Sequence, residues 1–106
     1  MKPNDHLLHL WGLEDGPARR FVEARLCDFT IRCFEQALDA PVGAADRLPR
    51  TYIASVKQGY PAKVVFDPFA ARARAEGWSY YELPVGHDGQ AEKPEALSRL
   101  LLEAGS

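Results

Sequence analysis

Residues 75–88 read AEGWSYYELPVGHD, and this stretch decides the fold. Gly77 is typical of a helix C-cap, because glycine adopts the left-handed conformation there without steric cost. The aromatic and apolar residues that follow predict a strand over residues 78–83. Residues 84–90 then form a predicted loop, and His87 lies within it. The stretch therefore predicts a helix end, a strand and a loop that carries a histidine.

The segments on either side of this stretch complete an alternating pattern. Before it, Asp67 is a predicted cap for a helix with Pro68 in its first turn and good helix formers over residues 69–76. Residues 50–55 combine β-branched and aromatic side chains and predict a strand. After it, a proline opens a helix over residues 94–104 with an apolar stripe. A strand-helix-strand-helix order predicts two parallel strands with a crossover helix, which makes the fold class α/β.

The first half of the chain carries weaker signals. A helix is predicted over residues 17–26, where a proline is tolerated in the first turn. Residues 29–38 are either extended or a short helix, and the first twelve residues show no clear period. Residues 39–49 hold small residues and two prolines, and they form the one candidate boundary. The sequence therefore predicts two parts. Residues 1–49 form a lid-like helical segment and a connector, and residues 50–106 form the β-α-β-α unit.

Composition limits the class of protein. The chain has 106 residues, of which 46% are hydrophobic and 26% charged, with a net charge of −2. These values indicate one small globular domain and exclude a solvated disordered chain. Interspersed charges without a basic patch argue against nucleic acid. The apolar runs fall far short of the roughly 18 residues that a membrane span needs, and no signal peptide is recognisable, so a cytoplasmic location is expected.

The second half resembles the C-terminal end of the α/β-hydrolase fold. The similarity is to small esterases related to plant methylesterases, hydroxynitrile lyases and bacterial salicylate-esterase-like proteins. It rests on residues 48–53, 75–83, 85–88, 94–97 and 100–102. In that family these positions correspond to the penultimate strand, a helix and the last strand, then the loop with the catalytic histidine and the final helix. Residues 12–15, 21–26 and 34–36 are similar to the end of the family's lid segment.

The resemblance implies that His87 is the general base of a Ser-His-acid triad acting on a small ester. Such a fold needs a Gly-x-Ser-x-Gly elbow before the histidine. Ser55 has no flanking glycine, and Ser79 lies within a predicted strand with Tyr81 where the second glycine belongs. The oxyanion-hole segment is missing as well. The chain is therefore expected to be catalytically incomplete and inactive alone.

The sequence does not decide which carboxylate is the acid partner of His87. In the related esterases it follows the penultimate strand, but residues 55–61 hold no carboxylate. Asp67 and Asp88 are the candidates. Each has a structural alternative, because Asp67 is positioned to cap the helix at Pro68 and Asp88 to cap the final helix.

No cofactor and no metal site are predicted. His6 and His9 have H-x₂-H spacing, but a metal site needs three or four converging ligands. Cys27 and Cys33 do not have the spacing of a zinc or redox motif and are predicted to be buried small hydrophobes. If the resemblance to the lid segment holds, Trp11, Phe29 and Phe34 line an acyl pocket; the alternative is packing in a core or an interface.

Three functions remain open from the sequence. The chain is the histidine-bearing part of an ester hydrolase, or a non-enzymatic small dimeric α/β domain with a binding role. The third possibility is a small enzyme that uses His87 with Asp67 or Asp88 for proton transfer. A two-stranded parallel sheet has open edges and is marginal alone. The expected partner is a second copy of this chain or a complementing N-terminal hydrolase segment, with no nucleic acid and no membrane.

Overall fold

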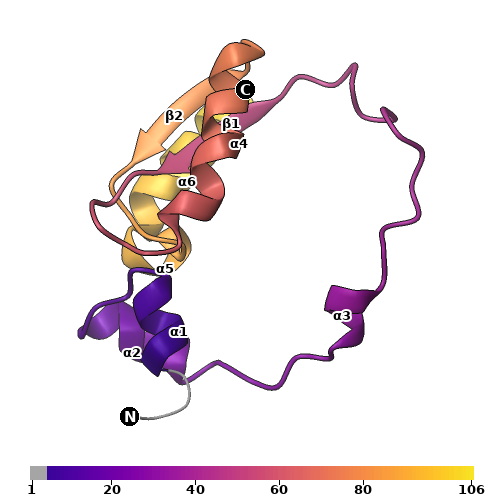
Figure 1. Cartoon of the computed structure of the whole chain (residues 1–106). Helices are drawn as coiled ribbons and strands as arrows, with labels where there is room; N and C mark the ends of the chain where they lie inside the picture. Colours follow the sequence, from indigo (N-terminus) through magenta and orange to yellow (C-terminus); the bar gives the residue numbers. More distant parts are fainter. Residues whose placement is uncertain (1–4) are drawn as a thin grey trace.

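The computed structural model describes residues 5–106. Over this range the architecture is mixed α/β, with a two-stranded parallel sheet and six helices, which confirms the predicted class. The elements in chain order are α1 (Asp5–Leu10), α2 (Pro17–Glu23), α3 (Arg32–Glu35), β1 (Thr51–Ser55), α4 (Lys63–Ala75), β2 (Ser79–Leu83), α5 (Gly89–Glu92) and α6 (Pro94–Ala104). Figure 1 shows α4 in front of the sheet and α6 behind it, with α1 and α2 at one end.

The two strands pair in parallel, with Thr51 opposite Ser79 and Ser55 opposite Leu83. The pairing continues beyond the strands. The backbone N–H of Val56 donates to the carbonyl of Leu83 at 2.9 Å, and the next residue, Lys57, donates to Val85 at 3.2 Å. The loops that follow β1 and β2 are therefore held together at the carboxyl end of the sheet, where open α/β folds bind their ligands.

Helix α4 begins earlier than predicted. It starts at Lys63 and includes Pro68, so the prediction that Asp67 caps a helix starting at Pro68 is wrong. Asp67 instead lies within the helix and accepts a 2.7 Å hydrogen bond from the Lys63 ammonium. Oppositely charged side chains four residues apart stabilise a helix by a few tenths of a kcal/mol. Pro68 lies inside α4 and has no N–H to donate to the carbonyl of Val64, so the helix extends back to Lys63 without that backbone hydrogen bond.

The end of α4 matches the prediction. Gly77 has a φ of +71°, and its N–H donates to Arg74 O at 3.2 Å. The N–H of Trp78 donates to Ala73 O at 3.0 Å. These two bonds form a Schellman motif, which turns the chain directly into β2.

The core runs from the N-terminal helices into the sheet. The buried apolar side chains are Leu8, Leu13, Ala54, Tyr60, Ala70, Ala73, Leu83 and Val85. Helix α1 has no clear signal in the sequence, yet it contributes Leu8 to this core. The Arg19 guanidinium donates a 2.6 Å hydrogen bond to Asp5, which joins α2 to α1. Packing against the rest of the chain is thus what forms α1, since a helix of this length is unstable alone.

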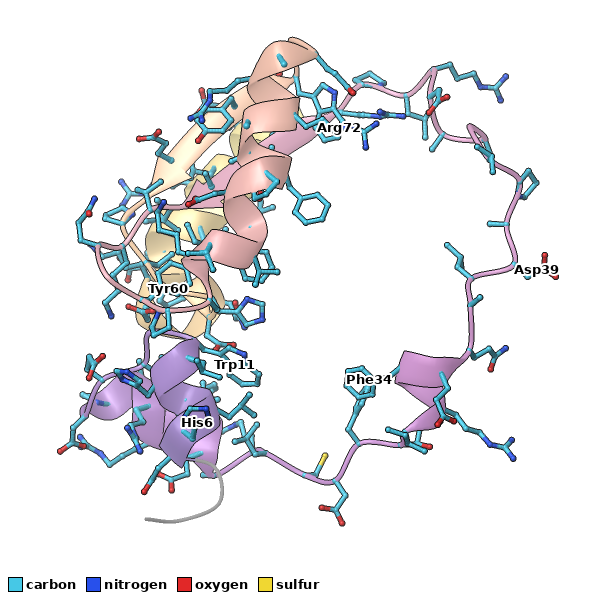
Figure 2. The ribbon with its side chains drawn as sticks, in the orientation of Figure 1. His6, Trp11, Phe34, Asp39, Tyr60 and Arg72 are labelled. Atoms are coloured by element: carbon cyan, nitrogen blue, oxygen red, sulfur yellow. The ribbon has the colours of Figure 1, made fainter. Side chains whose placement is uncertain are left out.

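Residues 27–49, here called the arm, connect α2 to β1, and every one of them is exposed. Figures 1 and 2 show the arm as a wide loop away from the other elements, with Phe34 and Asp39 on it. Cys27 and Cys33 are both exposed free thiols, so the prediction that they are buried is wrong. The reason is that no other part of residues 5–106 covers the arm. No helix formed by residues 5–106 is both long and apolar enough to cross a bilayer.

Candidate functional site

The structure places His87 in the loop between β2 and α5, just beyond the carboxyl end of β2. Its side chain is exposed. Its backbone N–H donates to the carbonyl oxygen of Trp11 at 2.8 Å, so the loop is bound to the end of α1. An imidazole at this edge of the sheet is accessible to a reacting group, as a general base must be.

Two aromatic rings from separate parts of the chain contact the His87 imidazole. The ring of Phe66, from α4, is nearly parallel to it, with centroids 5.3 Å apart and an angle of 12° between planes. The ring of Trp11 lies at the same centroid distance with an angle of 42°. Such contacts restrict the side-chain torsions of the histidine. Figure 2 shows Trp11 at the junction between the N-terminal helices and the loop that carries Tyr60.

The loop before His87 is held by a charged side chain. Glu92 accepts the backbone N–H of Gly86 at 2.8 Å through Oε1 and the Lys57 ammonium at 3.1 Å through Oε2. Lys57 also donates to the carbonyl of Gly12 at 2.6 Å. Three segments, the end of α1, the loop after β1 and α5, therefore converge on the backbone next to His87. Lys57 comes from the loop after β1, and residues 56–62 of that loop hold no carboxylate.

Gly86 is required by this arrangement. A Cβ on Gly86 would lie 2.3 Å from the carbonyl oxygen of Trp11 and 3.1 Å from Oε1 of Glu92. Both atoms belong to the hydrogen bonds that hold the loop. Only a residue without a side chain allows α1 to approach the loop this closely.

Asp88 is buried, with 9% of its surface exposed. Its Oδ1 accepts from the amide of Gln90 at 3.1 Å, while Oδ2 has no hydrogen-bond partner among residues 5–106. Burial raises the pKa of the Asp88 carboxyl, and the neighbouring His87 charge opposes that shift. Asp88 precedes α5 without a side-chain cap bond, and Lys93 precedes α6. The prediction that Asp88 caps the final helix is therefore wrong.

The Asp67 carboxylate is bound to Lys63 and not to His87. Its side chain is about half exposed and is paired with Lys63. The hydrogen bonds of the two candidate acids thus go to Lys63 and Gln90, and neither joins a carboxylate to the His87 imidazole.

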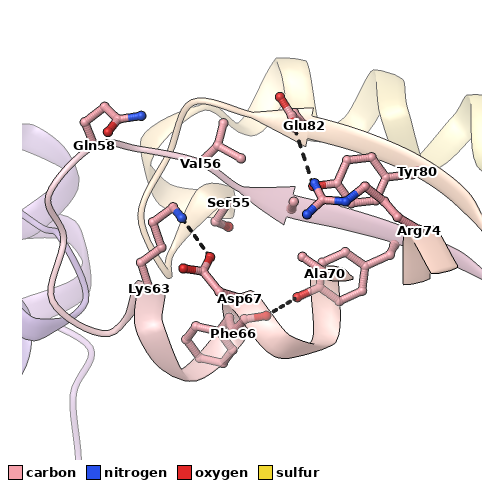
Figure 3. A pocket seen from close by; sticks show the side chains of 12 residues that line it. Ser55, Val56, Gln58, Lys63, Phe66, Asp67, Ala70, Arg74, Tyr80 and Glu82 are labelled. Atoms are coloured by element: carbon pink, nitrogen blue, oxygen red, sulfur yellow. Dashed lines mark hydrogen bonds and ion pairs between the residues drawn. The ribbon is translucent and has the colours of Figure 1, made fainter. Parts of the chain in front are cut away.

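A polar groove of about 320 Å³ lies between α4 and the sheet, next to this site (Figure 3). Phe66 lines it, so one aromatic side chain contacts both His87 and the groove. The Arg74 guanidinium donates to the Tyr80 hydroxyl at 3.0 Å inside it. The remaining lining residues are Tyr52, Ala54, Ser55, Val56, Gln58, Lys63, Asp67, Ala70 and Glu82. The volume is within the range of small-molecule sites.

The sequence places His87 in a loop after a strand, as the structure does, but it gives little signal for the residues that hold this loop. Trp11 is predicted as pocket lining or as core or interface packing, and Phe66, Lys57 and Glu92 carry no signal of their own. Gly86 is the one local signal, because glycine is the residue that allows a close approach of two backbones. Among the described residues, no three histidine, cysteine, aspartate or glutamate side chains converge as metal ligands.

Comparison of the chain with known proteins identifies no relative. No family model matches the chain, and no curated protein and no solved structure matches it significantly.

Proposed function

We propose that this chain is the histidine-bearing part of a serine ester hydrolase, and that His87 is its general base. The observation that supports this most directly is the place of His87. An exposed imidazole follows the last strand of a parallel sheet, on a loop that three other segments hold in place. The strand-helix-strand-helix order around it is the one that the resemblance to the C-terminal end of the α/β-hydrolase fold implies.

The serine and the oxyanion hole come, in this proposal, from a segment outside residues 1–106. His87 accepts the proton of the serine hydroxyl as its oxygen attacks the ester carbonyl, and it returns that proton to the leaving alcohol. Water then hydrolyses the acyl-serine by the same route in reverse, with His87 again as base. The substrate is a small ester, which matches the modest volume of the groove beside Phe66.

The test is complementation. The full chain is co-expressed with the nucleophile-bearing N-terminal portion of a plant methylesterase, and hydrolysis of 4-nitrophenyl acetate is measured on the purified complex. We expect a rate far above that of free imidazole, and we expect it to collapse in His87→Ala but not in His9→Ala, the matched exposed histidine. The chain alone is expected to be no faster than imidazole, because the nucleophile and oxyanion hole together supply many orders of magnitude.

Either of the following results would overturn this proposal. One is a folded complex whose rate is unchanged by His87→Ala. The other is hydrolysis by the chain alone that depends on His87, because a complete site would then exist within residues 1–106.

A binding role as a homodimer is the second candidate, and a separate observation favours it. Helix α4 exposes Val64, Val65 and Phe69, with 73%, 60% and 56% of their surfaces accessible. They lie on the helix that covers one face of a two-stranded sheet, and within residues 5–106 the strands of that sheet pair only with each other. Exposed apolar side chains on a helix and open edges of a sheet are both features that a second copy would cover.

A further inference from the structure

A carboxylate normally orients a catalytic histidine, but among residues 5–106 no carboxylate is hydrogen-bonded to the His87 imidazole. In a Ser-His-acid triad a carboxylate accepts the second ring N–H and holds the imidazole in the productive orientation. Here Asp67 is paired with Lys63, and Asp88 bonds to Gln90. The loop after β1 presents Lys57.

The imidazole is nevertheless restrained by other groups. The backbone at His87 is fixed by the 2.8 Å bond to Trp11 O, and the backbone at Gly86 by the 2.8 Å bond to Glu92. The side chain is then in contact with the rings of Trp11 and Phe66, each at 5.3 Å between centroids. Ring contacts restrict both side-chain torsions while the exposed surface of His87 stays available.

We propose that Trp11 and Phe66 are positioning residues for His87. They hold the imidazole in one orientation, as the carboxylate does in a complete triad, although they act through ring contacts alone. Trp11 contributes through its backbone and through its side chain. Its carbonyl oxygen fixes the backbone of the loop, and its indole contacts the His87 imidazole. The inference deepens the proposed function and rests on it for its catalytic consequence, whereas the orientation itself is a property of the chain alone.

The consequence is that α1 is part of the site. Trp11 directly follows α1, and the carbonyl of the preceding residue, Leu10, accepts a 2.9 Å bond from the N–H of Ala62. The N-terminal helix is thus attached to the loop that leads into α4, which carries Phe66. Docking of α1 therefore places the Trp11 ring against His87 and ties this helix to the loop before α4.

The orientation is tested by NMR on the full chain with labelled histidine. In the wild type we expect the His87 ring protons to be displaced by ring currents from those of His6 and His9, with Overhauser contacts to Trp11 and Phe66. Trp11→Leu and Phe66→Leu keep apolar bulk but remove the ring, and each should reduce that displacement. The matched control is Phe69→Leu, an exposed phenylalanine on the same helix, which should leave it unchanged.

The catalytic consequence is tested in the complemented hydrolase. Trp11→Leu and Phe66→Leu should lower kcat by about tenfold or more with little change in KM, because misplacement of a catalytic group affects the chemical step. Trp11→Phe and Phe66→Tyr retain a ring and should restore most of the rate. These two variants also serve if a leucine variant fails to fold.

The outcomes separate the two proposals. Wild-type His87 ring signals that coincide with those of His6 and His9 would overturn the positioning role, whatever the complex does. A change confined to KM, or an unchanged kcat in both leucine variants, would overturn it as well. A folded complex that is inactive with the wild-type chain would overturn the proposed hydrolase function, while the NMR result would still decide whether the rings orient His87.

Discussion

The backbone N–H of His87 donates a 2.8 Å hydrogen bond to the carbonyl oxygen of Trp11, so opposite ends of the chain meet at the candidate base. The bond is possible because the intervening space holds no side chain at Gly86. Glu92 and Lys57 hold the adjoining backbone from the other sides. The site is therefore a junction of distant segments, and its stability depends on each of them.

Gly86→Ala is expected to destabilise the protein. The added Cβ would lie 2.3 Å from Trp11 O, and the N-terminal helix must shift to relieve the clash. Overpacking of this kind costs about 1–3 kcal/mol, which lowers Tm by several degrees or more for a domain of about this size. Thermal unfolding followed by circular dichroism measures it. Gly105→Ala is the control, because its Cβ would be in ordinary contact at 3.4 Å. Equal Tm values for the two variants would contradict the close approach.

Lys57→Met is expected to lower the free energy of unfolding by about 1–2 kcal/mol, because Glu92 and the carbonyl of Gly12 lose a charged donor. Glu92 is mostly buried, with 15% of its side chain exposed, so water replaces the ammonium poorly. Urea denaturation gives the value, and the exposed Lys93→Met should stay within about 0.5 kcal/mol of the wild type. In a Glu92→Gln background the same Lys57 substitution should cost less. A cost that is the same in both backgrounds would show that the two side chains are not coupled.

Asp88 makes stability depend on pH in a defined direction. Burial raises the pKa of this carboxyl in the folded state above its unfolded value. Below the pKa of the unfolded state, the carboxyl is protonated in both the folded and the unfolded protein, so its burial carries no cost of burying a charge. As the pH rises through the raised pKa of the folded state, the buried carboxyl must ionise and the folded protein loses stability. Relative to Asp88→Asn, the wild type should therefore gain stability between pH 7 and pH 4. Urea unfolding of both proteins across that range provides the comparison, and a constant difference would contradict the prediction.

The arm is expected to be the first site of proteolysis. All residues from 27 to 49 are exposed, and they include Arg32 and Arg47. Exposed segments with few contacts open at little cost, whereas cleavage within α4 or α6 requires local unfolding. Brief trypsin treatment and mass spectrometry should therefore show cuts after Arg32 and Arg47 before cuts after Arg72 or Arg99. Early cleavage within α4 would contradict this order.

The chain alone is expected to form a homodimer at micromolar concentration. A second copy would pair with an open sheet edge or exchange the N-terminal helices through the arm, and it would cover Val65 and Phe69 on α4. Sedimentation equilibrium should give twice the chain mass of 11.8 kDa. Phe69→Asp should weaken the association, since a charge would then be buried at the contact. A folded monomer of 11.8 kDa with a sharp thermal transition would rule the dimer out.

Local signals in the sequence determined the second half of the fold. Gly77 ends α4 in a Schellman motif, Pro94 begins α6, and the aromatic stretch after Gly77 forms β2. These signals act over a few residues, through backbone conformation and side-chain alternation, so they can be read without knowing the partners. The loop position of His87 follows from them.

Only the tertiary structure decided what surrounds His87. Trp11, Phe66 and Glu92 come from segments that local propensity cannot bring together, because contacts between distant residues depend on how the elements pack. The same limit applies to α1, whose helix depends on burial of Leu8, and to α4, which extends back to Lys63 through a side-chain pair. The sequence therefore determined where the histidine lies along the chain, whereas packing determined which groups hold it.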